Sequence, residues 1–243
     1  MAETGHAKNL EQLKFARDFA ISWGAKYSPS NSLLVLANIN KIIDNAEPSL
    51  DDVITAKTPY RNATAEAQDT FDPLSELITR VMNGLKVSGV PASILDDAKT
   101  YSRKIKGQRK TPKPRDDPNS PNFDESEKAN SASQMSRTQR IENLDALISL
   151  LESRPEFAPN EDELKTATLS ALSAILKAKT GTVQTAFVEL SNKRANRNAI
   201  FYKDGTGLVN VGNLFKRYIE SFGRNSAEWN QIKDLKFKKI GQK

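Results

Sequence analysis

The chain lacks cysteine and has a single histidine, His6, among its 243 residues. Without thiols it can form no disulfide bond, thiolate nucleophile, zinc ribbon or iron–sulfur cluster site. One histidine near the start of the chain, outside the helices predicted below, is a poor basis for a Ser-His-Asp triad. It also cannot supply the Glu-x-x-His pairs of a di-metal bundle. We therefore expect no enzyme activity, no metal and no cofactor.

Motifs that need neither cysteine nor histidine are also scarce. No Asp-x-Asp-x-Asp-Gly calcium loop is present. The run Asp-Gly-Thr-Gly at 204–207 resembles part of a phosphate-binding loop, but no Lys-Ser/Thr pair follows it and no strand is predicted before it. We interpret this run as a turn. An all-carboxylate magnesium or calcium site stays open in principle, although Glu142, Asp145 and Glu152 are typical of a solvated helix face.

Long apolar runs are missing as well. Hydrophobic residues make up 37% of the chain and aromatic residues 7%, and the mean hydropathy is -0.58. No stretch reaches the ~18 apolar residues that a membrane span needs. The first eight residues contain no apolar core of a signal peptide. We therefore expect a cytoplasmic protein with no membrane segment.

Proline and charge gather in residues 107–138, which contain almost no aliphatic side chain. Such a composition buries too little area to offset the entropy of ordering the backbone. We expect a disordered linker that acts as a plain tether, with a docking peptide as the alternative. The linker divides the chain into a flexible tail (1–8), a first helical bundle (9–106) and a second helical bundle (139–243).

The two flanking regions resemble each other and indicate an internal repeat. Arg61-Asn62-Ala63 has its counterpart in Arg197-Asn198-Ala199. At one constant offset, a first apolar series matches a second, namely Leu74, Leu77, Val81 and Leu85 with Leu208, Val211, Phe215 and Ile219.

Apolar residues recur at helical spacing in both regions, and no segment shows a sustained alternation with the period of a strand. Basic and apolar residues alternate only over the short stretch 233–243. Pro48 should end one helix, and Pro59 should kink or break the next. The fold class is predicted to be all-α, with two small tandem antiparallel bundles of four to five helices each. The predicted helices cover residues 10–23, 33–46, 49 onward, 73–86 and 92–101, then 141–151, 164–176, 183–201 and 208–222.

Several short segments of the second half form a recognisable pattern, namely Pro159-Asn160-Glu161, Arg197-Asn198, Phe201-Tyr202, Thr206-Gly207-Leu208-Val209, Phe222-Gly223 and Lys236-Phe237. With these segments, the second half resembles a family of helical proteins of unknown function from Bacteroidetes. The resemblance covers roughly the last hundred residues and implies no activity. The first half lacks the Thr-Gly turn and has Pro73 in its place, so the two halves would differ if that turn binds a ligand.

The net charge of +6 is distributed unevenly along the chain. Residues 1–56 sum to −2 and residues 57–110 to +4, whereas residues 139–192 sum to −3 and residues 193–243 to +8. This pattern indicates either charge complementarity between neighbouring helices or a functional basic face. The candidate basic face consists of Lys216, Arg217, Arg224, Lys233, Lys236, Lys238 and Lys239.

Polar groups interrupt the apolar periodicity where each bundle interior should lie. A buried arginine needs a partner, so we expect carboxylates or backbone carbonyls to face these groups, or else a bound anion or peptide carboxylate. The residues of this candidate site are Arg61 and Asn62 in the first half and Arg194, Arg197 and Asn198 in the second.

Three functions are compatible with these features. The first is a non-enzymatic interaction or scaffolding module that presents duplicated surfaces to a protein partner. The alternative is a nucleic-acid-associated accessory protein that uses the basic second halves. However, Tyr218, Phe222 and Trp229 lie on apolar helix stripes, which favours the core over base-stacking platforms. The third is a small-molecule binder at the Arg-Asn interruption.

Overall fold

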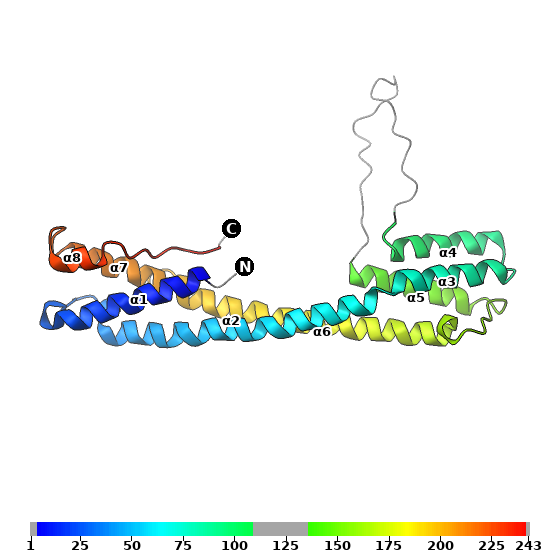
Figure 1. Ribbon diagram of the computed structural model, residues 1–243, viewed down its shortest axis with the longest axis horizontal. Helices are drawn as coiled ribbons and strands as arrows, with labels where there is room; N and C mark the ends of the chain where they lie inside the picture. Colours follow the sequence, from blue (N-terminus) through cyan, green and yellow to red (C-terminus); the bar gives the residue numbers. More distant parts are fainter. Residues whose placement is uncertain (1–3, 109–135, 242–243) are drawn as a thin grey trace, which may run out of the picture. The chain divides into compact units, whose positions relative to one another are not determined.

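The computed structural model describes residues 4–108 and 136–241 (Figure 1). Within these two ranges the chain forms eight α-helices and three short 3-10 helices, and it forms no β-strand. The all-α prediction is therefore confirmed for the described part of the chain. Residues 109–135 of the expected linker lie outside this part, and Arg137 already begins a helix.

The helices follow the same order in the two halves of the sequence. Each half has a first helix, a 3-10 turn, one long helix and two further helices. The long helices α2 and α6 have 36 and 37 residues. The first half contains α1 (Thr4–Trp23), η1 (Gly24–Lys26), η2 (Ser32–Leu34), α2 (Leu36–Phe71), α3 (Leu74–Val87) and α4 (Ala92–Ile105). The second half contains α5 (Arg137–Glu152), η3 (Asp162–Leu164), α6 (Thr166–Tyr202), α7 (Leu208–Glu220) and α8 (Ala227–Ile232).

The helix end predicted at Pro48 and the break predicted at Pro59 were wrong, because α2 runs through both prolines. A proline inside a helix removes a backbone hydrogen bond and costs about 3 kcal/mol. Tertiary burial outweighs this local cost, since Ala46, Leu50 and Val53 around the first proline are all buried. Propensity is a weak guide where one face of a helix is packed over its whole length.

The predicted helices 164–176 and 183–201 are one helix, α6, which also includes Gly181. The polar residues between the two apolar stripes remain helical, with Lys177 and Thr182 exposed to solvent. A solvated helix turn and a solvated loop have similar compositions, so the sequence did not distinguish them. The turn predicted at 204–207 is present between α6 and α7.

The described helices belong to two compact units that do not coincide with the expected bundles 9–106 and 139–243. Unit 1 contains Met1–Arg61 and Ala186–Lys243, and unit 2 contains Asn62–Thr185. Each unit therefore combines helices from both halves of the sequence. Each long helix contributes one end to unit 1 and the other end to unit 2.

The core of unit 1 joins α1 and the start of α2 to the end of α6, α7 and α8. The indole of Trp23 stacks on Phe215 with a centroid distance of 6.2 Å, and Tyr27 contacts the same ring at 5.5 Å. The hydroxyl of Tyr27 donates to the carbonyl of Leu34, and burial raises the pKa of this phenol well above its usual range. Aromatic packing thus joins residues far apart in the sequence.

The first helix of unit 1 begins earlier than expected. Residues 4–8 of the predicted flexible tail are helical, and His6 is buried within α1. The imidazole packs edge-on against Phe201 and obliquely against Tyr202, both at 5.7 Å between ring centroids. The sequence suggested an exposed tail because Phe201 and Tyr202, which cover this turn, lie far away in the chain.

The core of unit 2 joins the end of α2, α3 and α4 to α5 and the start of α6. Arg140 of α5 links two helix ends, because its guanidinium donates to the carbonyls of Ile105 (2.9 Å) and Phe71 (3.5 Å). It also lies 5.1 Å from the ring centroid of Phe71. A cation there neutralises the partial negative charge at the C-terminal ends of α2 and α4. Burial lowers the pKa of Arg140, and the Asp72 carboxylate opposes this shift.

The division of each core between both halves leads to a test with the fragments 1–108 and 136–243. Each fragment alone contains only part of the core of unit 1 and part of the core of unit 2. We therefore expect no cooperative thermal transition from a monomeric fragment. Mixing the two should restore helix content and cooperativity, as measured by circular dichroism and sedimentation. A monomeric 1–108 fragment with full helicity and a cooperative transition would contradict this arrangement.

Candidate interaction site

The residues of the basic face lie in unit 1, on α7, on the turn between α7 and α8 (Arg224) and on residues 233–241, here named the C-terminal segment. α7 is strongly amphipathic and buries Val211, Phe215 and Ile219 against the core. Ser226 precedes α8 and caps it, because its side-chain hydroxyl accepts from the amide of Trp229 at 3.1 Å. These two helices fix the surface on which the C-terminal segment lies.

α8 is attached to α1 and its adjoining turn by two long-range polar contacts. The indole N–H of Trp23 donates to Gln231 at 2.8 Å, and the ammonium of Lys26 donates to Glu228 at 2.6 Å. The hydrogen bond from Lys26 is the main cause that lowers the pKa of the Glu228 carboxyl. The start of the C-terminal segment is therefore held by the N-terminal part of the chain.

The C-terminal segment is held through its backbone. Asn9 donates to the carbonyl of Lys238 at 2.8 Å and accepts from the amide of the same residue at 3.1 Å. Gln12 accepts from the amide of Lys236, and the hydroxyl of Tyr202 accepts from the amide of Ile240 at 3.3 Å. These side chains satisfy alternate peptide groups much as a neighbouring strand would.

Two glycines allow apolar side chains of the C-terminal segment to pack closely. A Cβ atom at Gly212 of α7 would lie only 2.5 Å from the ring of Phe237. A Cβ atom at Gly5 of α1 would lie 3.1 Å from the side chain of Ile240. Phe237 is buried as a result, whereas Lys236 and Lys238 on either side of it are exposed.

Lys216 differs from the other residues of the basic face because it has a structural role. Its ammonium donates to the carbonyls of Lys233 (2.8 Å) and Leu235 (2.6 Å) and lies 5.7 Å from the ring centroid of Trp229. Burial is the main cause that lowers the pKa of this lysine. The side chain joins α7 to the C-terminal segment and is only partly accessible.

The remaining residues of the basic face are exposed, namely Arg217, Arg224, Lys233, Lys236, Lys238 and Lys239. Arg224 pairs with Glu220 at 2.6 Å, and Lys239 lies 3.5 Å from Asp204. Lys233 donates to Asn230 at 3.2 Å. Among the described residues no carboxylate pairs with Arg217, Lys236 or Lys238.

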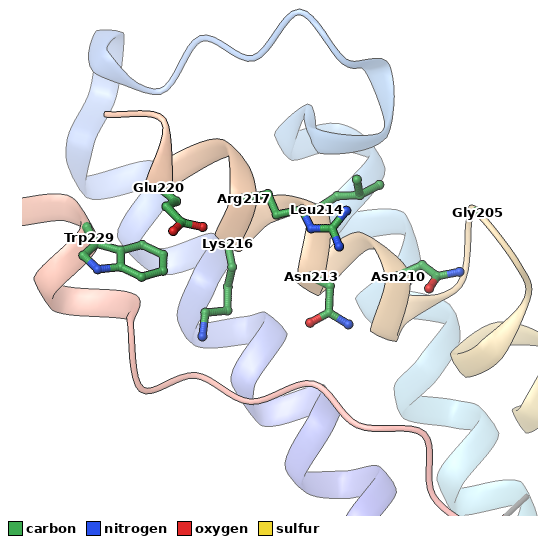
Figure 2. Close-up of a pocket in the computed structure, with 8 residues that line it drawn as sticks. All are labelled: Gly205, Asn210, Asn213, Leu214, Lys216, Arg217, Glu220 and Trp229. Atoms are coloured by element: carbon green, nitrogen blue, oxygen red, sulfur yellow. The ribbon is translucent and has the colours of Figure 1, made fainter. Parts of the chain in front are cut away.

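A shallow pocket of about 590 Å³ lies on the outer side of α7. In Figure 2 the side chains of Asn213 and Lys216 extend from α7 toward the C-terminal segment, and Trp229 closes one end. Arg217 supplies an exposed guanidinium to its wall. The lining residues are Gly205, Asn210, Asn213, Leu214, Lys216, Arg217, Glu220 and Trp229.

The repeat predicted buried arginine and asparagine side chains in both halves, and the structure buries only Arg197 among them. Arg197 is buried, and its Nε and Nη2 atoms donate to Asn198 Oδ1 at 3.2 and 2.8 Å. Arg61 and Asn62 are exposed, and Arg194 is half-buried.

Helix geometry explains why the two Arg-Asn pairs differ. Arg197 lies four residues before Phe201 at the end of α6, whereas the residue four before Phe71 at the end of α2 is the buried Ala67. The matching Arg-Asn letters therefore do not occupy matching positions on the two long helices. One partner of Arg197 is the side-chain amide oxygen of the neighbouring Asn198.

The backbone-binding roles of Asn9 and Gln12 were not predicted from the sequence. Both residues are polar positions on a helix that otherwise has an ordinary apolar stripe, and Asn9 is buried. The basic–apolar alternation at the C-terminus was a usable signal, since it is typical of an extended segment with one packed face.

Within the described ranges, no group of histidine, aspartate and glutamate side chains is arranged to hold a metal ion. No helix in that part of the chain combines the length and apolar character needed to cross a membrane. Comparison with protein-family models, with curated proteins and with solved structures finds no match for this chain.

The bonds made by Lys216 predict that Lys216→Met lowers the free energy of unfolding by about 1–2 kcal/mol, because two charge-assisted hydrogen bonds are lost. Lys233→Met is the matched control, since its ammonium bonds only to a side chain on the surface. It should change stability by about 0.5 kcal/mol or less. Urea unfolding followed by circular dichroism measures both free energies. Equal effects would show that the bonds of Lys216 to the C-terminal segment do not stabilise the fold.

Proposed function

We propose that the protein is a non-enzymatic helical interaction module whose unit 1 binds an acidic surface of a protein partner. The main observation is the concentration of charge. Residues 1–61 and 186–243 contain 19 basic and 12 acidic side chains, whereas residues 62–185 contain 17 and 18. Unit 1 therefore carries +7 of the net charge, and unit 2 carries −1.

The three cations Arg217, Lys236 and Lys238 are held on an ordered backbone, which favours binding of a partner over a merely solvated surface. Arg217 lies on a helix packed into the core, and Lys236 and Lys238 flank the buried Phe237. The backbone at both lysines is bonded to α1. Cations held on such a scaffold lose less conformational entropy at the backbone on binding than cations on a free tail.

The aromatic residues favour a protein partner over single-stranded nucleic acid. Tyr218 contacts Phe222 at 5.1 Å and Tyr27 at 5.6 Å, so its ring packs within unit 1. Phe222 and Trp229 also pack against the core. Rings engaged in this way do not offer the exposed faces on which bases stack.

The sequence suggested two similar binding surfaces, one in each half, and this proposal keeps two surfaces but gives them different partners. The shared helix order of the two halves supports two related units, each assembled from both halves. Their opposite net charges favour different roles. We therefore assign the acidic partner to unit 1 alone, and unit 2 serves as a second, chemically distinct surface of the scaffold.

The proposal predicts saturable binding of a glutamate-rich peptide, measured by fluorescence anisotropy at about 50 mM salt. The triple reversal Arg217→Glu, Lys236→Glu and Lys238→Glu should weaken this binding by about tenfold or more, because it replaces three unpaired cations with anions. The matched control reverses three exposed lysines of unit 2, Lys86, Lys99 and Lys165, and should leave the affinity unchanged.

A single-stranded DNA of the same net charge distinguishes the two classes of partner. The acidic-partner proposal predicts weaker binding of this DNA than of the peptide. Tighter DNA binding that is lost between about 50 and 200 mM salt would replace it with the nucleic-acid function. Equal weakening by both triple variants would show that no particular face is responsible.

A further inference from the structure

We propose that the groove between α1 and α7 is a binding site for an extended peptide, and that the chain's own C-terminal segment occupies it as a displaceable competitor. The ligand is a partner segment with the chemistry of residues 235–240. It has apolar side chains at the positions of Leu235, Phe237 and Ile240 and solvent-facing residues between them. This site is separate from the acidic-partner surface proposed above, but a bound partner segment would release Lys236 and Lys238 from that surface.

The groove recognises the backbone of the segment that lies in it. Asn9 binds both the amide and the carbonyl of one residue, as a neighbouring β-strand does. That residue is Lys238. Gln12 accepts from the amide of Lys236, and the hydroxyl of Tyr202 accepts from the amide of Ile240. All these groups are side chains of helices, so they remain in place when the segment leaves.

Specificity comes from two positions where the groove lacks a side chain. Gly212 leaves room for the ring of Phe237, since even a methyl group there would lie 2.5 Å from it. Gly5 does the same for Ile240. A ligand therefore needs a large apolar side chain at the first position and a second one three residues later.

The C-terminal segment is suited to exchange. Apart from the carbonyls bound by Lys216 and the Lys239–Asp204 ion pair at the surface, its long-range bonds run from backbone groups to Asn9, Gln12 and Tyr202. None of the described residues 235–241 belongs to a helix or strand. Phe237 is the one residue of the segment whose side chain is buried. Local opening of such a segment costs much less than global unfolding.

Competition within one chain suggests how to reveal the site. A tethered segment acts at an effective concentration on the order of millimolar, so it masks its groove from a free peptide. Phe237→Ala removes the main apolar contact of the segment without changing a groove residue. The loss of this buried ring should weaken internal docking by about 100-fold and open the groove.

The test uses the full chain and a fluorescent synthetic peptide with the sequence of residues 233–241. We expect the peptide to bind the Phe237→Ala chain saturably and at least about tenfold more tightly than the unaltered chain. The double variant Phe237→Ala with Gly212→Leu should not bind it, because the leucine fills the space left for the ring. A peptide carrying its own Phe237→Ala change should bind none of the three chains.

Two results would overturn the proposal. One is a Phe237→Ala chain that keeps its helix content by circular dichroism yet does not bind the peptide. The other is equal binding by all three chains, which would indicate adsorption of a basic peptide by charge alone.

Hydrogen exchange on the unaltered chain gives an independent measurement should Phe237→Ala lose its helical structure. Opening of the C-terminal segment predicts that the amides of Lys236 and Lys238 exchange at least about tenfold faster than the amides of α7. Exchange of both sets at the same slow rate would show that the segment opens only with the whole unit, and the proposal would fail.

Discussion

The structure depends on the continuity of two long helices, α2 and α6. Because each contributes one end to unit 1 and the other end to unit 2, no core consists of consecutive helices alone. In unit 1 the apolar face of α1 is completed by Phe201, Phe215 and Ile219 from the end of the sequence. In unit 2 the faces of α3 and α4 are completed by α5 in the same way. Stability of the first half is therefore linked to the presence of the second.

This arrangement gives the charge pattern of the sequence a physical meaning. The mildly acidic beginning of the chain packs in unit 1 with its strongly basic end, where the Lys26–Glu228 and Lys193–Asp52 pairs join the two. Complementarity between neighbours thus accounts for part of the pattern. It does not account for the unpaired cations Arg217, Lys236 and Lys238, which lie on a backbone fixed by other contacts. Those cations support a binding role, and the backbone contacts of the C-terminal segment support a second one.

Local signals in the sequence were reliable where packing agreed with them. The apolar stripe at 208–222 forms α7 and contributes Phe215 to the core of unit 1, and the turn at 204–207 lies where its composition indicated. The signals failed where tertiary contacts opposed them. Pro48 and Pro59 do not interrupt α2, and His6 lies in a buried helix turn instead of a flexible tail. In each case the decisive contact comes from residues distant in the chain, which a short window does not contain.

The sequence by itself determined the all-helical class, the lack of cysteine, and the position of the charges along the chain. These properties follow from composition and from the period of apolar residues, which are local. Only the tertiary structure decided which helices share a core, that Arg197 is buried while Arg61 is exposed, and that the last residues lie against α1. The reason is that an apolar stripe predicts that one face of a helix is buried but does not indicate which element buries it. The same stripe of α1 would pack against any complementary face, and only the tertiary structure shows that it meets α7, α8 and the end of α6.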